Sequence, residues 1–249
     1  MESAVFALDT KLLVFASFSI FLAYAVKGIS GFGAGLVAIP LLAFVLPLHI
    51  CVPAVSLLSY AGNIAQFIAL RRDASWHDVW PLAPFSILGV ATAVWMLTAI
   101  DASHLALALG IFVLLYALVS LLPSLDAHGS RAWALPIGYS GGLVGALFGS
   151  GGFVYVVYLN LRQLDKARFR ASVAMTLFFD GTFRITGYSA ASLYDSQTLT
   201  LVAMFVPVML IAMYSGHRLQ IRIAQKRFQQ IVSMLLIACS VLLIAKALQ

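Results

Sequence analysis

The chain has 249 residues, of which 62% are hydrophobic and only 10% are charged, with a formal net charge of +6. A soluble domain carries roughly 25% charged residues, so this chain has too few charges to cover a surface that faces water. The composition therefore excludes an ordinary soluble domain and predicts an integral membrane protein. The basic residues lie in short connections, as orientation signals do in membrane proteins, so they do not indicate binding to nucleic acid.

Hydrophobic runs follow one another along the whole chain. Most have about 20 residues, which is the length of a helix that spans a bilayer. We therefore expect an all-α membrane fold of about eight hydrophobic helical units. The runs cover 11–27, 36–47, 50–70, 79–99, 104–122, 132–148, 153–161, 168–191, 198–216 and 229–248.

Glycine-rich segments interrupt two of the apolar stretches. The first segment is Gly28–Gly35, within the stretch 11–48, and the second is Phe148–Phe153, within the stretch 132–161. Each glycine disfavours a continuous helix by about 1 kcal/mol relative to alanine. We expect the chain to leave the helical conformation at both places.

The basic connections distinguish a kink from a chain reversal at each break. If each break only kinks a helix, the basic connections fall on both sides of the membrane. If each break reverses the chain into a hairpin, all of them lie on one side, which the positive-inside rule makes the cytoplasmic side, and both termini lie outside. The basic connections are 71–72, 123–131, 162–170 and 217–227.

The hairpin interpretation divides the chain into two repeats, 1–124 and 125–249, within one integrated membrane domain. Each repeat begins with a glycine-broken helical hairpin and continues with three spans, so its odd number of segments inverts the second repeat relative to the first. Inverted repeats with broken helices are typical of secondary transporters, and we expect the two glycine tips to approach each other near the membrane centre. An offset of 117 residues pairs Asn63 with Asp180, which supports the repeats weakly.

The two breaks resemble the signature of a known transporter family. Gly31-Phe-Gly-Ala-Gly35, followed by Pro40, and Phe148-Gly-Ser-Gly-Gly152 are similar to the GxGGG…P pattern of the sulfite exporter TauE/SafE family. The chain departs from that pattern at Ala34, Ser150 and Val157. The resemblance covers essentially the whole chain. It implies a transporter of small anions such as sulfite, sulfonates, sulfoacetate or related carboxylates in the cytoplasmic membrane.

The glycine tips are the first candidates for an anion site. Where a helix is broken, backbone N–H groups lack an intrahelical acceptor, and together with the positive end of the helix dipole they bind anions. Glycine also lets a ligand approach the backbone closely. The alternative is that the small residues only permit tight helix packing. The candidates are Gly31, Gly33, Gly35, Gly149, Gly151 and Gly152, with the hydroxyl groups of Ser30 and Ser150.

Polar side chains within the apolar runs are the second group of candidates. Asp180 and Arg184 are four residues apart and can pair on one helix face. Arg184 could hold an oxyanion with its planar guanidinium, while Asp180 could take a proton or position Arg184; the alternative is a neutral ion pair that specifies packing. Lys27, beside the first break, could bind the anion or extend toward the membrane surface. The predicted substrate-binding residues also include Asn63, Gln66 and Thr176.

Other functions stay open beside anion transport. A passive anion channel would show the same features, and a membrane accessory protein would need no polar site at all. Gly28-Ile29-Ser30-Gly31 matches a nucleophile motif of intramembrane serine proteases, but that chemistry needs a histidine at the depth of Ser30. The five histidines lie at segment ends or in connections.

We expect no enzymatic activity, no catalytic residues, no metal and no cofactor. The expected partners are the small anionic substrate, the lipid bilayer and, if transport is coupled to an ion, protons, because no acidic cluster indicates a sodium site. A homodimer is among the oligomeric states that the sequence allows.

Overall fold

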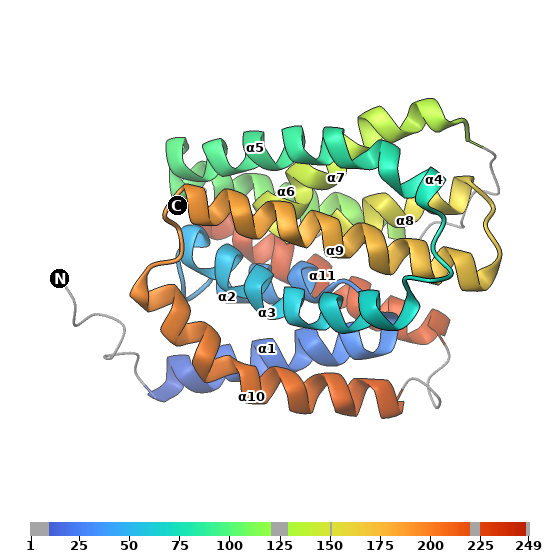
Figure 1. The fold of residues 1–249 in the computed structure, drawn as a ribbon. Coiled ribbons are helices and arrows are strands. Elements are labelled where there is room, and N and C mark those ends of the chain that lie inside the picture. Colours follow the sequence, from blue (N-terminus) through green and yellow to red (C-terminus); the bar gives the residue numbers. More distant parts are fainter. Residues whose placement is uncertain (1–9, 121–128, 150, 220–224, 248–249) are drawn as a thin grey trace. The chain divides into compact units, whose positions relative to one another are not determined.

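The computed structural model describes residues 10–120, 129–149, 151–219 and 225–247. Every regular element in this part of the chain is a helix (Figure 1). Five helical stretches are long and apolar enough to cross a membrane, which confirms the predicted all-α membrane fold. They are Leu12–Ser30, Leu48–Leu70, Trp76–Ala99, Ala102–Val119 and Ser196–Leu219, and shorter apolar helices occupy Gly151–Leu161 and Val232–Lys246.

The helices are short or long according to where glycine, proline and polar segments interrupt the apolar runs. In chain order they are α1 (Thr10–Ser30), α2 (Ala34–Leu42), α3 (Leu48–Leu70), α4 (Trp76–Val79), η1 (Trp80–Leu82), α5 (Ala83–Ala99), α6 (Ala102–Ser120), η2 (Arg131–Trp133), α7 (Ala134–Phe148), α8 (Gly151–Leu161), α9 (Lys166–Ala190), α10 (Ser196–Leu219) and α11 (Gln225–Ala247).

Both glycine-rich segments separate two helices. Between α1 and α2, Gly31 and Gly33 have φ angles of +85° and +89°. After α7, the C-cap Gly149 has a φ of +64°. Side chains other than hydrogen strongly disfavour this left-handed region, so glycine is the residue that lets the helix end there.

The chain reverses direction at the second break. There Gly145 of α7 lies against Gly151 of α8, and Gly141 of α7 lies against Tyr155 of α8. The numbering falls along α7 while it rises along α8, so the two helices are antiparallel. Across the first break, α2 packs against α1. The predicted hairpin is confirmed at the second break, whereas the reversal at the first break and the inversion of the two repeats stay predictions.

The contacts group the helices into two compact units, and each unit draws on both halves of the sequence. Unit 1 contains α1, α2, α6, α10 and α11, with α1 packed on α2 and α10, and α6 packed on α11. Unit 2 contains α4, α5, α7, α8, α9 and most of α3, with α7 packed on α5 and α8, and α9 packed on the same two helices. The repeats 1–124 and 125–249 stay a prediction.

Glycines let α5 and α7 pack backbone to backbone in unit 2. A Cβ atom added at Gly89 would collide with the carbonyl oxygen of Tyr139, and one added at Gly142 would collide with that of Ser86. Small residues at helix interfaces allow this close approach. Part of the glycine content of this chain therefore serves packing.

A buried carboxylate joins three connections of unit 2. The side chain of Asp78 is 8% exposed. It accepts hydrogen bonds from the Oγ of Ser75 at 2.7 Å and the Nε of Arg162 at 2.8 Å, and the Nε of Arg131 lies 3.8 Å away. Arg162 also donates from Nη1 to the carbonyl oxygen of Gly129 at 2.7 Å. Arginines that the sequence assigns to membrane orientation thus also hold α4, η2 and the end of α8 together.

Gly142→Ala is expected to lower the free energy of unfolding by about 1–3 kcal/mol, because the added methyl group forces α5 and α7 apart. Gly187→Ala is the matched control: its methyl group would meet only the side chains of Val94, at 3.1 Å, and Val90, and helix propensity favours alanine by about 1 kcal/mol. Thermal unfolding in detergent measures both variants. Equal stability of the two would contradict the backbone contact between α5 and α7.

Asp78→Asn is expected to lower the free energy of unfolding by about 1–3 kcal/mol, because a partly buried Arg162 loses its charged partner. The control is Asp165→Asn, which removes an exposed ion pair with Arg168 whose N–O distance is 3.4 Å. Asparagine keeps the N-cap of α9, so the control should change stability by about 0–1 kcal/mol. Denaturant unfolding of the detergent-solubilised variants checks both values; a control that loses as much stability as Asp78→Asn would contradict a structural role for the Asp78 cluster.

Candidate functional site

The second hairpin and the helix α5 that packs on it contain no charged side chain. α7 and α8, which form it, and α5, which packs on α7, contain no Asp, Glu, Lys, Arg or His. Among the described residues of unit 2, the buried charges beside the hairpin come from α9, as Asp180 (2% exposed) and Arg184 (5% exposed). The Oδ2 of Asp180 lies 3.0 Å from the Nε of Arg184, so the predicted pairing is confirmed. Charges in the interior of a membrane helix are costly and often functional, which makes this pair the centre of the candidate site.

Arg184 reaches the broken end of α7. Its Nη1 donates to the carbonyl oxygen of Gly145 at 2.9 Å and lies 3.4 Å from the Oγ of Ser56 on α3. One turn further along α9, the hydroxyl of Tyr188 donates to the carbonyl oxygen of Ala146 at 2.6 Å. Carbonyl groups in the last turn of a helix lack intrahelical donors and carry the negative end of the dipole. A cation and a hydroxyl from α9 thus stabilise the point at which α7 stops.

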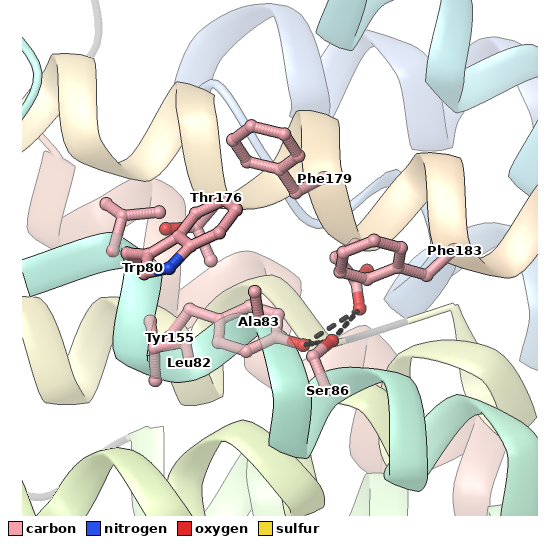
Figure 2. A pocket seen from close by; sticks show the side chains of 10 residues that line it. Trp80, Leu82, Ala83, Ser86, Tyr155, Thr176, Phe179 and Phe183 are labelled. Atoms are coloured by element: carbon pink, nitrogen blue, oxygen red, sulfur yellow. Dashed lines mark hydrogen bonds between the residues drawn. The ribbon is translucent and has the colours of Figure 1, made fainter. Parts of the chain in front are cut away.

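The other oxygen of Asp180 is bound by two hydroxyl groups. Its Oδ1 accepts a hydrogen bond from the Tyr155 hydroxyl on α8 at 2.8 Å, and the Oγ of Ser86 on α5 lies 3.3 Å away. The two hydroxyl oxygens are 2.8 Å apart, and Figure 2 shows them side by side. Sequence reasoning missed both residues, because isolated hydroxyl side chains are ordinary in apolar helices. Only the packing of α5 and α8 on α9 reveals them.

A pocket adjoins this cluster (Figure 2). The centre of a water molecule can move within about 10 Å³ of this pocket, so the pocket has room for about one water. The lining residues with polar side chains are Trp80, Ser86, Tyr155, Thr176 and Asp180, and no cation is among them, so the pocket suits a water molecule or a proton better than an anion. The complete lining is Val79, Trp80, Leu82, Ala83, Ser86, Tyr155, Thr176, Phe179, Asp180 and Phe183.

Two of the three remaining polar candidates of unit 2 contact or lie on α9 near this pair. Asn63 is 3% exposed, and its Nδ2 donates to the carbonyl oxygen of Leu177 at 3.2 Å, which links α3 to α9. The hydroxyl of Thr176 donates to the carbonyl oxygen of Ser172 in its own helix at 2.8 Å. Gln66 is half-buried on α3. The structure therefore gathers Asn63 and Thr176 around the middle of α9.

The glycines of the second break have different surroundings. Gly149 caps α7 with its left-handed backbone, and its N–H donates to the carbonyl oxygen of Gly145 at 2.9 Å. Gly151 is buried against α7, where a Cβ atom would collide with the carbonyl oxygen of Gly141. A bulky side chain at Gly151 would therefore disturb packing before it could fill an anion site. Gly152 is half-buried, and Ser150 lies outside the described residues.

The candidates of the first break belong to unit 1. Lys27 is 3% exposed near the end of α1, and its carbonyl oxygen accepts from the N–H of Gly31 at 2.7 Å. The hydroxyl of Ser30 is within donor distance of two backbone oxygens, those of Val26 at 2.8 Å and Phe32 at 2.6 Å. Ser30 thus behaves as a backbone cap, which gives the serine-protease alternative no support. The other glycines are Gly33, which is the N-cap of α2, and Gly35, which is buried within it.

Metal-ligand geometry is not found in the described part of the chain, where no three His, Cys, Asp or Glu side chains come together. No curated protein and no solved structure is significantly similar to the chain. By contrast, the sequence profile described as "Sulfite exporter TauE/SafE" matches residues 16–243, which include both glycine breaks and the Asp180–Arg184 pair. With its apolar helices, this multi-pass membrane protein therefore belongs to the sulfite exporter TauE/SafE family of transporters.

Proposed function

We propose that this chain is a secondary transporter that moves a small anion across the cytoplasmic membrane and binds it beside Arg184. The expected substrates are sulfite, a sulfonate, sulfoacetate or a related carboxylate. The observation that carries the proposal is the place of Arg184, which is the buried cation among the described residues of unit 2 and lies 2.9 Å from the backbone of a broken helix.

The chemistry of the guanidinium fits an oxyanion. Its planar array of N–H donors matches the oxygens of carboxylates, and the same geometry serves sulfite and sulfonates. Asp180 already presents a carboxylate to Arg184 at 3.0 Å. An anionic substrate that replaced the Asp180 carboxylate would bind the same guanidinium of Arg184, which matches it in charge and shape.

The first break carries the other predicted substrate-binding residues. We propose that Lys27, Ser30 and the glycines of the first hairpin also bind the anion, while the inversion of the repeats stays a prediction. The buried position of Lys27 and the left-handed backbone of Gly31 and Gly33 support this role. The basic connections then face the cytoplasm, and protons are the expected coupling ion.

Arg184→Ala is expected to reduce sulfite uptake into proteoliposomes at least tenfold, because alanine removes the charge. Arg184→Lys is expected to reduce it severalfold, because lysine keeps the charge but not the planar guanidinium. Arg168→Ala is the control, since Arg168 is 67% exposed and pairs only with its neighbour Asp165 at 3.4 Å among the contacts described. It should retain wild-type uptake. Uptake that saturates with sulfite concentration would distinguish a carrier from a passive channel.

An unpaired Asp180 could prevent the Arg184 variants from folding. The double variant Asp180→Asn, Arg184→Gln removes both charges and avoids that problem. It should fold, as judged by size-exclusion chromatography in detergent, and should not bind sulfite, sulfoacetate, methanesulfonate or acetate. A folded double variant with wild-type uptake would contradict the role of Arg184.

A further inference from the structure

Anion binding at Arg184 creates a charge imbalance in the proposed site. Within unit 2, the ionised Asp180 and Arg184 together are neutral, so one monovalent anion bound there leaves a net charge of −1. α5, α7 and α8 contain no Lys, Arg or His whose positive charge could compensate it. Because the region is apolar, such a charge is strongly unfavourable. A proton on Asp180 restores neutrality.

The environment of Asp180 provides a place and a route for that proton. Its Oδ1 is 2.8 Å from the Tyr155 hydroxyl, which is itself 2.8 Å from the Ser86 hydroxyl. A hydroxyl group can both donate and accept, so this short chain can reverse its direction. The adjoining pocket, with room for about one water, is lined by the same three residues. Water can therefore deliver a proton on the side of Asp180 that bears Oδ1, while Arg184 lies against Oδ2.

We propose that Asp180 is the proton-binding site of this transporter and that one proton and one monovalent anion bind together. The inference rests on the proposed function. A proton from the aqueous phase reaches the water in the pocket as hydronium. One O–H bond of that hydronium breaks, which leaves neutral water, and an O–H bond forms at the Oδ1 of Asp180. The Tyr155 hydroxyl, which donates to the ionised carboxylate, then accepts from the protonated one and donates to Ser86. Arg184 is thereby released from its ion pair and binds the anion; the reverse sequence releases both.

The groups that face Asp180 define what can titrate there. α9 contributes Arg184, and α8 contributes the phenol of Tyr155. α5 contributes the Ser86 hydroxyl, and α7 contributes only the backbone of Gly145, whose added Cβ atom would lie 3.3 Å from Asp180. Among these described neighbours, Asp180 is the single acid. Tyr155 and Ser86 are positioning residues, since they act on the anion only through Asp180.

The test uses the full-length protein in proteoliposomes with methanesulfonate, which stays monovalent from pH 5 to 8, and a pH-sensitive dye inside. Wild-type uptake should acidify the lumen with one proton per anion and should fall as the external pH rises, because fewer Asp180 side chains are protonated. Asp180→Asn resembles the protonated state. It should take up methanesulfonate without proton movement and without the pH dependence.

Tyr155→Phe keeps the ring and removes one hydrogen bond to the ionised carboxylate, so the midpoint of the pH profile should move to higher pH. Tyr139→Phe is the matched control, because Tyr139 lies on α7 with its hydroxyl 3.4 Å from Thr92 and should leave the profile unchanged. If Asp180→Asn does not fold, the comparison of the pH profiles of Tyr155→Phe and Tyr139→Phe still tests whether Asp180 binds the proton.

The outcomes separate the two proposals. Wild-type uptake that moves no protons, or an unchanged pH profile in Tyr155→Phe, overturns the proton site and leaves anion transport standing. If wild-type protein takes up neither methanesulfonate nor sulfite nor acetate, both the proposed function and the proton site fall.

Discussion

The ion pair between Asp180 and Arg184 connects α9 to four other helices of unit 2. Through Asp180 it binds α8 and α5, and through Arg184 it binds the end of α7 and the Ser56 side chain of α3. Neither charge could be buried among these apolar helices alone, because the penalty for an unpaired ion in such surroundings is several kcal/mol. The pair therefore constrains the packing of α9 and fixes where the second hairpin sits within unit 2.

The same interaction explains how a broken helix can be stable at this place. α7 ends at its C-cap Gly149, whose N–H donates to the carbonyl oxygen of Gly145, and later carbonyl groups of the last turn lack donors from the helix itself. Arg184 adds a second donor to the Gly145 carbonyl, and Tyr188, one turn further along α9, supplies a donor to that of Ala146. Arg184 is therefore held in position by its contact with the end of α7, and a movement of Arg184 would also affect α7. A change in the Asp180–Arg184 contact would consequently act on the hairpin as well as on a bound anion.

The glycines serve two physical purposes that look alike in a sequence. Gly31, Gly33 and Gly149 adopt left-handed backbone angles where α1 ends, α2 begins and α7 ends, respectively. Gly142 and Gly151 instead lie where any side chain would collide with a neighbouring backbone. A count of glycines cannot separate these purposes, because both require the absence of a Cβ atom. The distinction matters for function, since a substitution at a packing glycine reports on the fold and not on the anion.

The membrane class, the helical fold, the two glycine breaks and the family can be read from the sequence alone, because hydrophobic runs and glycine clusters act locally along the chain. The possible pairing of Asp180 with Arg184 can be read there too, since residues four apart share a helix face. The groups that surround that pair are known only from the packing of the helices. Tyr155 and Ser86 come from other helices, at sequence separations of 25 and 94 residues from Asp180, and Asp78 meets Arg162 across 84 residues. Such contacts depend on how helix faces pack, which no periodicity in a single sequence specifies.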